Sequence, residues 1–330
     1  MLNMGMTKSF PLHCTKKSPL SNTVGNNMDS TKKYERKLSS LNQCPPALNE
    51  RQVSVLMKMN MEATKLSAAS EKELLNKLSK EKLNKVALHI QYYCDIIIHF
   101  FLDKLIEAFL TDQDGRYKNL FETGRGNGSN CKITRARWED RLFFDGYSNA
   151  EAYERVKYGC LNVAQDVCGV ASAYQYGDSF FILNNDTVRS RATLSDGDTA
   201  NPKRAVGTFS ACHHVIERFS NDELNSIYRL INPNDSLNSM TDDSPKTGES
   251  DKEDEMGEIF TMKEVQIHGN LRFQEDIKTL VISKRHTDSI IGACSNRPNN
   301  SDPSLSGDQS LLEKTKKFCE LYDIELKLQD

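Results

Sequence analysis

The chain has 330 residues, of which 38% are hydrophobic, and a formal net charge of −3. This length suffices for one large domain or two ordinary ones, but the hydrophobic fraction is low for a chain packed throughout, so part of it is expected to be unstructured. The near-neutral charge gives no indication of nucleic-acid or membrane binding. The nine cysteines include no CxxC pair, which argues against a zinc cluster and predicts reduced thiols in a cytosolic or nuclear protein.

The N-terminal third is predicted to be a disordered tail followed by helices. Residues 1–50 are rich in Ser, Asn and Lys and are expected to be disordered. Residues 51–111 are expected to be helical, with Ser70 and Glu73 at the spacing of a capping box. The most apolar segment, 86–110, predicts a buried helix, because its charged residues exclude a membrane span.

Residues 112–330 are predicted to form a domain that mixes strands and helices. Short apolar runs bounded by turn signals indicate strands in YKNLFET, DSFFILN, RATLS, EVQIHGNLRF and TLVIS. Helical patterns occur in TRARWEDRLFFD, DELNSIYRLI and SLLEKTKKFCELY, and partly in NAEAYERVKYGCLNVAQDV. The mixture favours the α+β class. Residues 235–258 contain nine acids and two lysines, which predicts a disordered acidic insertion.

The stretch YKNLFETGRGNGS places an acid and a glycine-rich loop after an expected strand. Glu122 is followed by Gly124, Gly126 and Gly128, with Asn127 between the last two glycines. Glycines let backbone amides approach a phosphate or a nucleotide closely. The alternative is a hairpin turn that needs positive φ angles, with Glu122 a solvated acid at the end of the strand.

Two further stretches combine small residues with groups suited to a ligand. In ERVKYGCLN, Arg155 and Tyr158 are typical of sites for a diphosphate or a planar ring, although a helix end stopped by Gly159 explains the same pattern. In YGDSFFIL, Ser179 lies at a strand start, where a small residue allows a ligand to come close. The alternative there is an ordinary core strand.

The stretch EVQIHG predicts a polar face on an otherwise apolar strand. Glu264, Gln266 and His268 alternate and should point the same way, which makes them a candidate site if that face is buried. An exposed sheet face is the alternative. His213 and His214 are neighbours and cannot form a ligand pair on one helix face, so no metal site is predicted. No local motif supports a Cys–His nucleophilic pair.

Taken in order, these blocks resemble the CteC-like mono-ADP-ribosyltransferases, whose essential residues form an E-R-E set. The resemblance covers roughly residues 85–330 without the acidic insertion. It implies an ADP-ribosyltransferase-like split β-sandwich with flanking helices, in which two sheets hold NAD, and here a helical N-terminal extension. The chain departs from the family pattern at LHIQYYCD, where an HFHPD-like segment is common, and at Val156, where proline is common.

The resemblance also implies roles for individual residues. The E-R-E set falls on Glu122, Arg155 and Glu264, the expected catalytic residues. A carboxylate at Glu264 would stabilise the positive charge that develops on the ribose as nicotinamide leaves, and Arg155 would hold the diphosphate. Glu122 would orient the ribose or the acceptor hydroxyl. The residues expected to bind NAD are Gly124, Gly126, Asn127, Gly128, Tyr158, Gly159 and Ser179.

The implied activity is transfer of ADP-ribose from NAD to a protein acceptor. The effectors of this family modify a threonine of ubiquitin, which makes ubiquitin the first partner to consider. A cytoplasmic location is expected, with the nucleus or secretion into a host as alternatives. Two other functions stay open: an inactive binding module with the same fold, and an unrelated α+β interaction protein in which Glu122, Arg155 and Glu264 lie far apart.

Overall fold

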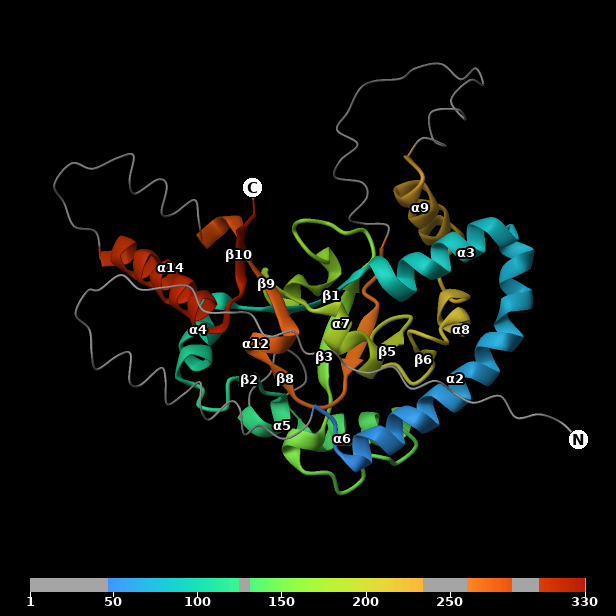
Figure 1. Ribbon diagram of the computed structural model, residues 1–330, viewed down its shortest axis with the longest axis horizontal. Helices are drawn as coiled ribbons and strands as arrows, with labels where there is room; N and C mark the ends of the chain where they lie inside the picture. Colours follow the sequence, from blue (N-terminus) through green and yellow to red (C-terminus); the bar gives the residue numbers. More distant parts are fainter. Residues whose placement is uncertain (1–46, 125–130, 234–259, 287–302, 330) are drawn as a thin grey trace, which may run out of the picture. The chain divides into compact units, whose positions relative to one another are not determined.

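The computed structural model describes residues 47–124, 131–233, 260–286 and 303–329. They belong to one compact unit, Pro45–Asp330, whose centre is an eight-stranded sheet with helices at both of its ends (Figure 1). This mixture of a large sheet and separate helices confirms the predicted α+β class. Almost all of the expected N-terminal tail and the whole acidic insertion lie outside the described residues. Within the described ranges, no helix has the length and apolar character needed to cross a membrane.

The large sheet is antiparallel except at one edge, where β10 runs parallel to β9. In spatial order its strands are β10 (Glu325–Leu328), β9 (Ile277–Ile282), β4 (Ser179–Leu183), β1 (Asp95–Phe100), β3 (Lys157–Asn162), β7 (Glu264–Ile267), β5 (Ala192–Ser195) and β6 (Val206–Thr208). A separate two-stranded sheet pairs β2 (Arg116–Tyr117) with β8 (Leu271–Arg272).

The register of the central strands lines up polar residues on one face. Gln266 of β7 lies between Tyr158 of β3 and Thr193 of β5, and Glu264 lies opposite Cys160. Because side chains alternate along a strand, these five residues share a face. The sequence pattern of β7 therefore extends into a polar region that spans three strands.

The helix expected from residue 51 is confirmed as α2 (Glu50–Lys77), but its N-terminal cap is not the predicted one. The side chain of Asn49 accepts a hydrogen bond from the Gln52 amide, and the side chain of Gln52 accepts one from the Asn49 amide. This capping box starts the helix, and Ser70 and Glu73 lie within it, so the capping box predicted at those two residues is wrong. The helix contacts α8 (His213–Ile216) and β6.

The predicted buried helix over 86–110 is wrong in its middle. The chain forms α3 (Lys80–Leu88), the π-helix η1 (His89–Tyr93), strand β1 and helix α4 (Leu102–Thr111). Ile96, Ile97 and Ile98 of β1 are fully or nearly fully buried between sheet neighbours on both sides. A strand covered on both faces is apolar throughout, and such a run has no periodicity that separates it from a helix.

The secondary structure differs from the expected one in two further stretches, YKNLFET and ERVKYGCLN. Of the expected strand YKNLFET, only β2 is a strand, and α5 (Leu120–Thr123) is a short helix that begins at Asn119. The stretch ERVKYGCLN contains strand β3 rather than a helix end. Gly159 therefore lies within a central strand and does not stop a helix.

The remaining elements complete the two ends of the sheet. The expected helices are confirmed as α6 (Lys132–Leu142), α9 (Asn221–Ile231) and α14 (Pro303–Tyr322). An aromatic cluster joins α14 and α4 to the sheet through Phe109, Phe181, Phe273 and Phe318. The shorter helices are η2 (Ala152–Glu154), η3 (Ala171–Tyr176), α7 (Asn185–Val188), η4 (Arg189–Arg191) and α12 (Phe273–Asp276).

Candidate functional site

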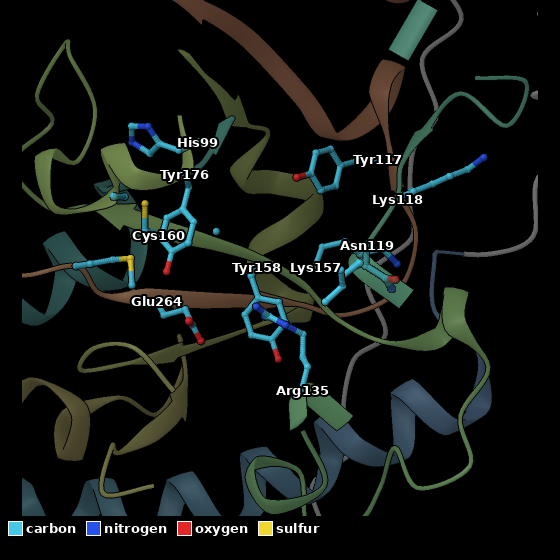
Figure 2. Close-up of a pocket in the computed structure, with 14 residues that line it drawn as sticks. His99, Tyr117, Lys118, Asn119, Arg135, Lys157, Tyr158, Cys160, Tyr176 and Glu264 are labelled. Atoms are coloured by element: carbon cyan, nitrogen blue, oxygen red, sulfur yellow. The ribbon is translucent and has the colours of Figure 1, made fainter. Parts of the chain in front are cut away.

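A cavity of about 130 Å³ lies along β3, where the polar face of the sheet meets η3, α6 and the chain before α5. Figure 2 shows Glu264 and Tyr158 rising from neighbouring strands into it, with Tyr176 extending toward Glu264 and Arg135 beside the Tyr158 ring. Typical ligand pockets measure about 300–1,000 Å³. The enclosed space therefore suits one ring or one polar group of a larger ligand.

Glu264 is the carboxyl group that the fold places in this cavity. The residue is only 8% exposed, and its Oε1 accepts hydrogen bonds from the Thr199 hydroxyl and from the Gln266 amide, the latter at 2.9 Å. Burial raises the pKa of Glu264 to about 7, whereas the two hydrogen bonds and the charge of Arg135 act in the opposite direction. The group is therefore held in one orientation and titrates near neutral pH.

The polar face predicted for β7 continues inward from Glu264 as a chain of hydrogen bonds. The Thr193 hydroxyl donates to Gln266 at 2.7 Å and lies 3.4 Å from Nε2 of His268, whose Nδ1 lies 2.7 Å from the Tyr147 hydroxyl. The chain is satisfied when every donor points toward Glu264. The Tyr147 hydroxyl then donates to Nδ1 of His268, and Nε2–H of His268 donates to the Thr193 hydroxyl. That hydroxyl donates to Gln266, whose amide donates to Glu264. Gln266 and His268 are 0% exposed, so the alternative of an exposed sheet face is wrong.

Tyr158 and Arg135 line another part of the cavity, and Glu139 of α6 anchors Tyr158. The Tyr158 hydroxyl donates to Glu139 of α6 at 3.3 Å, and the guanidinium of Arg135 lies 4.6 Å from the centroid of the Tyr158 ring. Burial raises the pKa of Glu139 to about 7, against the opposing effects of Arg155, Arg135 and Tyr158. Arg135 and Tyr158 thus form a stacked pair at the edge of the cavity.

Arg155 lies behind this part of the cavity rather than in its lining. Its Nη1 donates to Glu139 at 2.8 Å, its Nη2 donates to the Tyr147 carbonyl at 3.2 Å, and its guanidinium stacks on Phe121 at 4.5 Å. The residue is 7% exposed. Its charge is therefore already satisfied by the protein, which does not fit the expected direct contact with a diphosphate.

Glu122 also lies one layer behind the cavity. It occupies the third position of α5, where its Oε2 accepts from the Asn119 amide at 3.1 Å and its Oε1 lies 2.6 Å from Arg116. The Asn119 side chain in turn donates to the carbonyls of Ala152 and Arg155, at 2.8 and 2.9 Å. Glu122 thereby fixes Asn119, which does line the cavity.

Lys157, a cation of the candidate stretch ERVKYGCLN, is a buried amine in the cavity lining. Its Nζ donates to the carbonyls of Gly269, Tyr153 and Arg155, at 2.7, 3.2 and 3.4 Å. Burial lowers the pKa of Lys157 to about 8. Its three donor positions are directed at backbone carbonyls, so it ties β3 to the turn after β7.

Cys160 and His99 both line the cavity but are unsuited to act as a nucleophile and its base. Burial raises the pKa of the Cys160 thiol, which disfavours the reactive thiolate. Nδ1 of His99 lies 2.8 Å from the Gly177 carbonyl and Nε2 accepts from the Val170 amide at 3.1 Å, so both nitrogens are occupied. The described residues also contain no cluster of ligands for a metal ion.

The residues expected to bind NAD divide into several groups. Tyr158 and Gly159 line the cavity. Gly124 ends α5 at φ +69°, and an added Cβ would meet no described atom within 4 Å, so the backbone conformation explains the glycine. Ser179 is fully buried in β4 away from the cavity, where its hydroxyl accepts from the Ser283 amide. Gly126, Asn127 and Gly128 lie outside the described residues.

The structure therefore connects the E-R-E residues without placing all three in the cavity. Asn119 joins Glu122 to Arg155, and Arg155 reaches Tyr158 through Glu139. Only Glu264 of the three lines the cavity. The lining residues that sequence reasoning missed include Asn119, Arg135 and Tyr176. Only Asn119 had a visible signal, since Asn three residues before Glu marks a helix start.

Residues 85–297 match the model of a family described as "Protein of unknown function (DUF3626)". The matched segment includes β1, β3, β7 and α6, and with them every residue that lines the cavity. A comparison with curated proteins gave no match.

Proposed function

We propose that this chain, which belongs to the DUF3626 family, is an NAD-dependent mono-ADP-ribosyltransferase that modifies a protein. The observation that carries the proposal is the position of Glu264, a buried carboxyl group held by two hydrogen bonds at a cavity that an aromatic and a cationic side chain also line. The family resemblance of the sequence blocks assigns the last glutamate of the E-R-E set to this same residue.

The reaction breaks the bond between the ribose C1′ and the nicotinamide nitrogen, and the bonding electrons leave with nicotinamide. Positive charge develops on the ribose, and a fixed carboxylate next to it lowers the barrier. The acceptor hydroxyl then bonds to C1′ and loses its proton. Since Thr199 and Gln266 already orient Glu264, the carboxylate needs little reorganisation when the charge appears.

In this proposal Glu122 and Arg155 support the site from behind. Glu122 fixes Asn119, and Arg155 fixes Glu139 and through it Tyr158. The ADP-ribosyltransferase-like split β-sandwich, NAD as substrate and a threonine of ubiquitin as acceptor belong to the same proposal. They rest on the resemblance, while the described strands form one eight-stranded sheet and one two-stranded sheet.

The test is incubation of the purified chain with labelled NAD, a cell lysate and added ubiquitin, with release of nicotinamide measured in parallel. We expect the wild type to transfer label and Glu264→Gln to lose at least about 100-fold in rate, as in other sites that lose a preorganised charge. Glu320→Gln is the matched control, because it removes an exposed carboxylate of α14 that does not line the cavity.

The outcomes separate the candidate functions. Transfer to the ubiquitin band supports the proposed acceptor, whereas transfer to another band supports the enzyme class and replaces the acceptor. Binding of NAD without release of nicotinamide would favour a binding module. A wild type that neither binds nor cleaves NAD would contradict the proposal.

A further inference from the structure

We infer that Arg135, rather than the Arg155 of the E-R-E set, is the residue that binds the diphosphate of a nucleotide in this cavity. That the nucleotide is NAD rests on the proposed function. That Arg135 is the cation that binds it rests only on the residues of the cavity.

The other cations at or behind the cavity are already committed to the protein. The Nζ of Lys118 lies 2.5 Å from Oδ2 of Asp112 and 3.0 Å from Oδ2 of Asp114. Lys157 donates to three backbone carbonyls, and Arg155 is paired with Glu139 at 2.8 Å. Each would have to break an existing interaction before it could bind an anion, which is costly at buried positions.

Arg135 differs from these residues in its partners. It lines the cavity as Lys118 and Lys157 do, but within the described part of the chain it forms no ion pair with a carboxylate. Its Nε is shielded from solvent and has no hydrogen-bond partner among the described residues. An arginine fork matches the paired oxygens of a phosphate, so a bound phosphate would supply the partner that this nitrogen lacks.

The surroundings hold the Arg135 side chain in place for such a ligand. Its guanidinium packs over the ring of Tyr158 at 4.6 Å and near the ring of Trp138 at 5.6 Å. The Tyr158 hydroxyl is anchored on Glu139, which in turn is held by Arg155. Arg155 therefore acts as a positioning residue for the stacked pair, a role that would fit its place in the E-R-E set although it lies outside the cavity lining.

The charges also set the direction in which a dinucleotide would bind. Arg135 and Glu264 both line the cavity, and the charge of Arg135 acts to lower the pKa of Glu264. A ligand with an anionic diphosphate and a ribose that becomes cationic fits between them in one orientation. The diphosphate would lie at Arg135 and the reacting ribose at Glu264.

Calorimetric titration of the full chain with ADP and with adenosine tests this assignment. We expect the wild type to bind ADP more tightly than adenosine, and Arg135→Gln to weaken ADP binding at least about 10-fold, the range for a hydrogen bond to a charged group. Adenosine binding should not change. Arg137→Gln is the matched control, because it removes an exposed guanidinium from the same helix outside the cavity lining.

An unchanged ADP affinity in Arg135→Gln would overturn the inference. So would an equal loss for adenosine, which would indicate a distorted pocket, or a wild type that does not prefer ADP. If Arg135→Gln does not fold, Arg135→Lys keeps the charge without the fork and should weaken ADP binding by a smaller factor. Loss of ADP binding in a chain that never cleaves NAD would support this site and contradict only the transferase.

Discussion

The behaviour of Glu264 depends on a balance between burial and its immediate neighbours. Burial favours the neutral acid, while Thr199, Gln266 and Arg135 favour the carboxylate. The pKa of about 7 that results leaves the group divided between both forms at neutral pH. The proposed chemistry needs the carboxylate, so activity should rise with pH through this value.

Replacing Gln266 tests that balance at the level of one hydrogen bond. In Gln266→Leu the carboxylate loses a donor at 2.9 Å, so the pKa of Glu264 should rise further and the midpoint of the pH profile of kcat/KM should move to higher pH. The measurement is nicotinamide release as a function of pH for the variant, the wild type and Gln113→Leu, an exposed control. A lower rate with an unmoved midpoint would show that Gln266 has only a structural role.

Strand β3 is the element that links the sheet to the cavity. It pairs with β1 on one side and β7 on the other, and four consecutive residues, Lys157 to Cys160, line the cavity. A Cβ on Gly159 would lie 2.5 Å from the Ile97 carbonyl oxygen and 3.1 Å from Ile98. The glycine is therefore needed for the close approach of β1, whatever the cavity binds.

We expect Gly159→Ala to destabilise the fold by roughly 3 kcal/mol, because a backbone carbonyl cannot move aside without disturbing the strand pairing. Gly124→Ala is the comparison. A Cβ at this position would meet no atom of the described residues within 4 Å, so the substitution should cost only about 1 kcal/mol for the positive φ. Chemical unfolding of both variants measures the difference, and equal losses would contradict the steric argument.

Across the whole molecule, buried acids and buried histidines give opposite dependences of stability on pH. Burial lowers the pKa of His99 to about 4 and of His268 to about 3, so their contribution to stability is lost as pH falls below about 6.5. Glu264 and Glu139 have raised pKa values, so their contribution is present below about 4.5 and lost as pH rises toward 7. The two effects partly cancel between pH 4.5 and 6.5.

Replacing one buried acid should make the effect of the histidines on the pH dependence of stability easier to measure. In Glu264→Gln we expect the free energy of unfolding to rise more steeply with pH between 4.5 and 6.5 than in the wild type. The difference in slope should be at most about 1.4 kcal/mol per pH unit, the limit for one proton. Denaturant unfolding of both proteins at several pH values measures it, and parallel profiles would contradict the raised pKa.

The sequence by itself determined the features that depend on local chemistry. The α+β class, the helices α6, α9 and α14, and the strands β4, β5 and β9 follow patterns of period 3.6 or 2 in short windows. The alternation of Glu264, Gln266 and His268 predicted a shared polar face for the same reason. These features needed no knowledge of what packs against them.

Only the tertiary structure decided which residues meet. An apolar run such as Ile96 to Ile98 becomes a strand because β3 and β4 lie on either side of it, which no local pattern reveals. Likewise, Arg135 and Arg155 are both arginines near aromatic residues, but Glu139 pairs with Arg155 and leaves Arg135 at the cavity. Long-range contacts set burial and charge partners, and these determine what each side chain can bind.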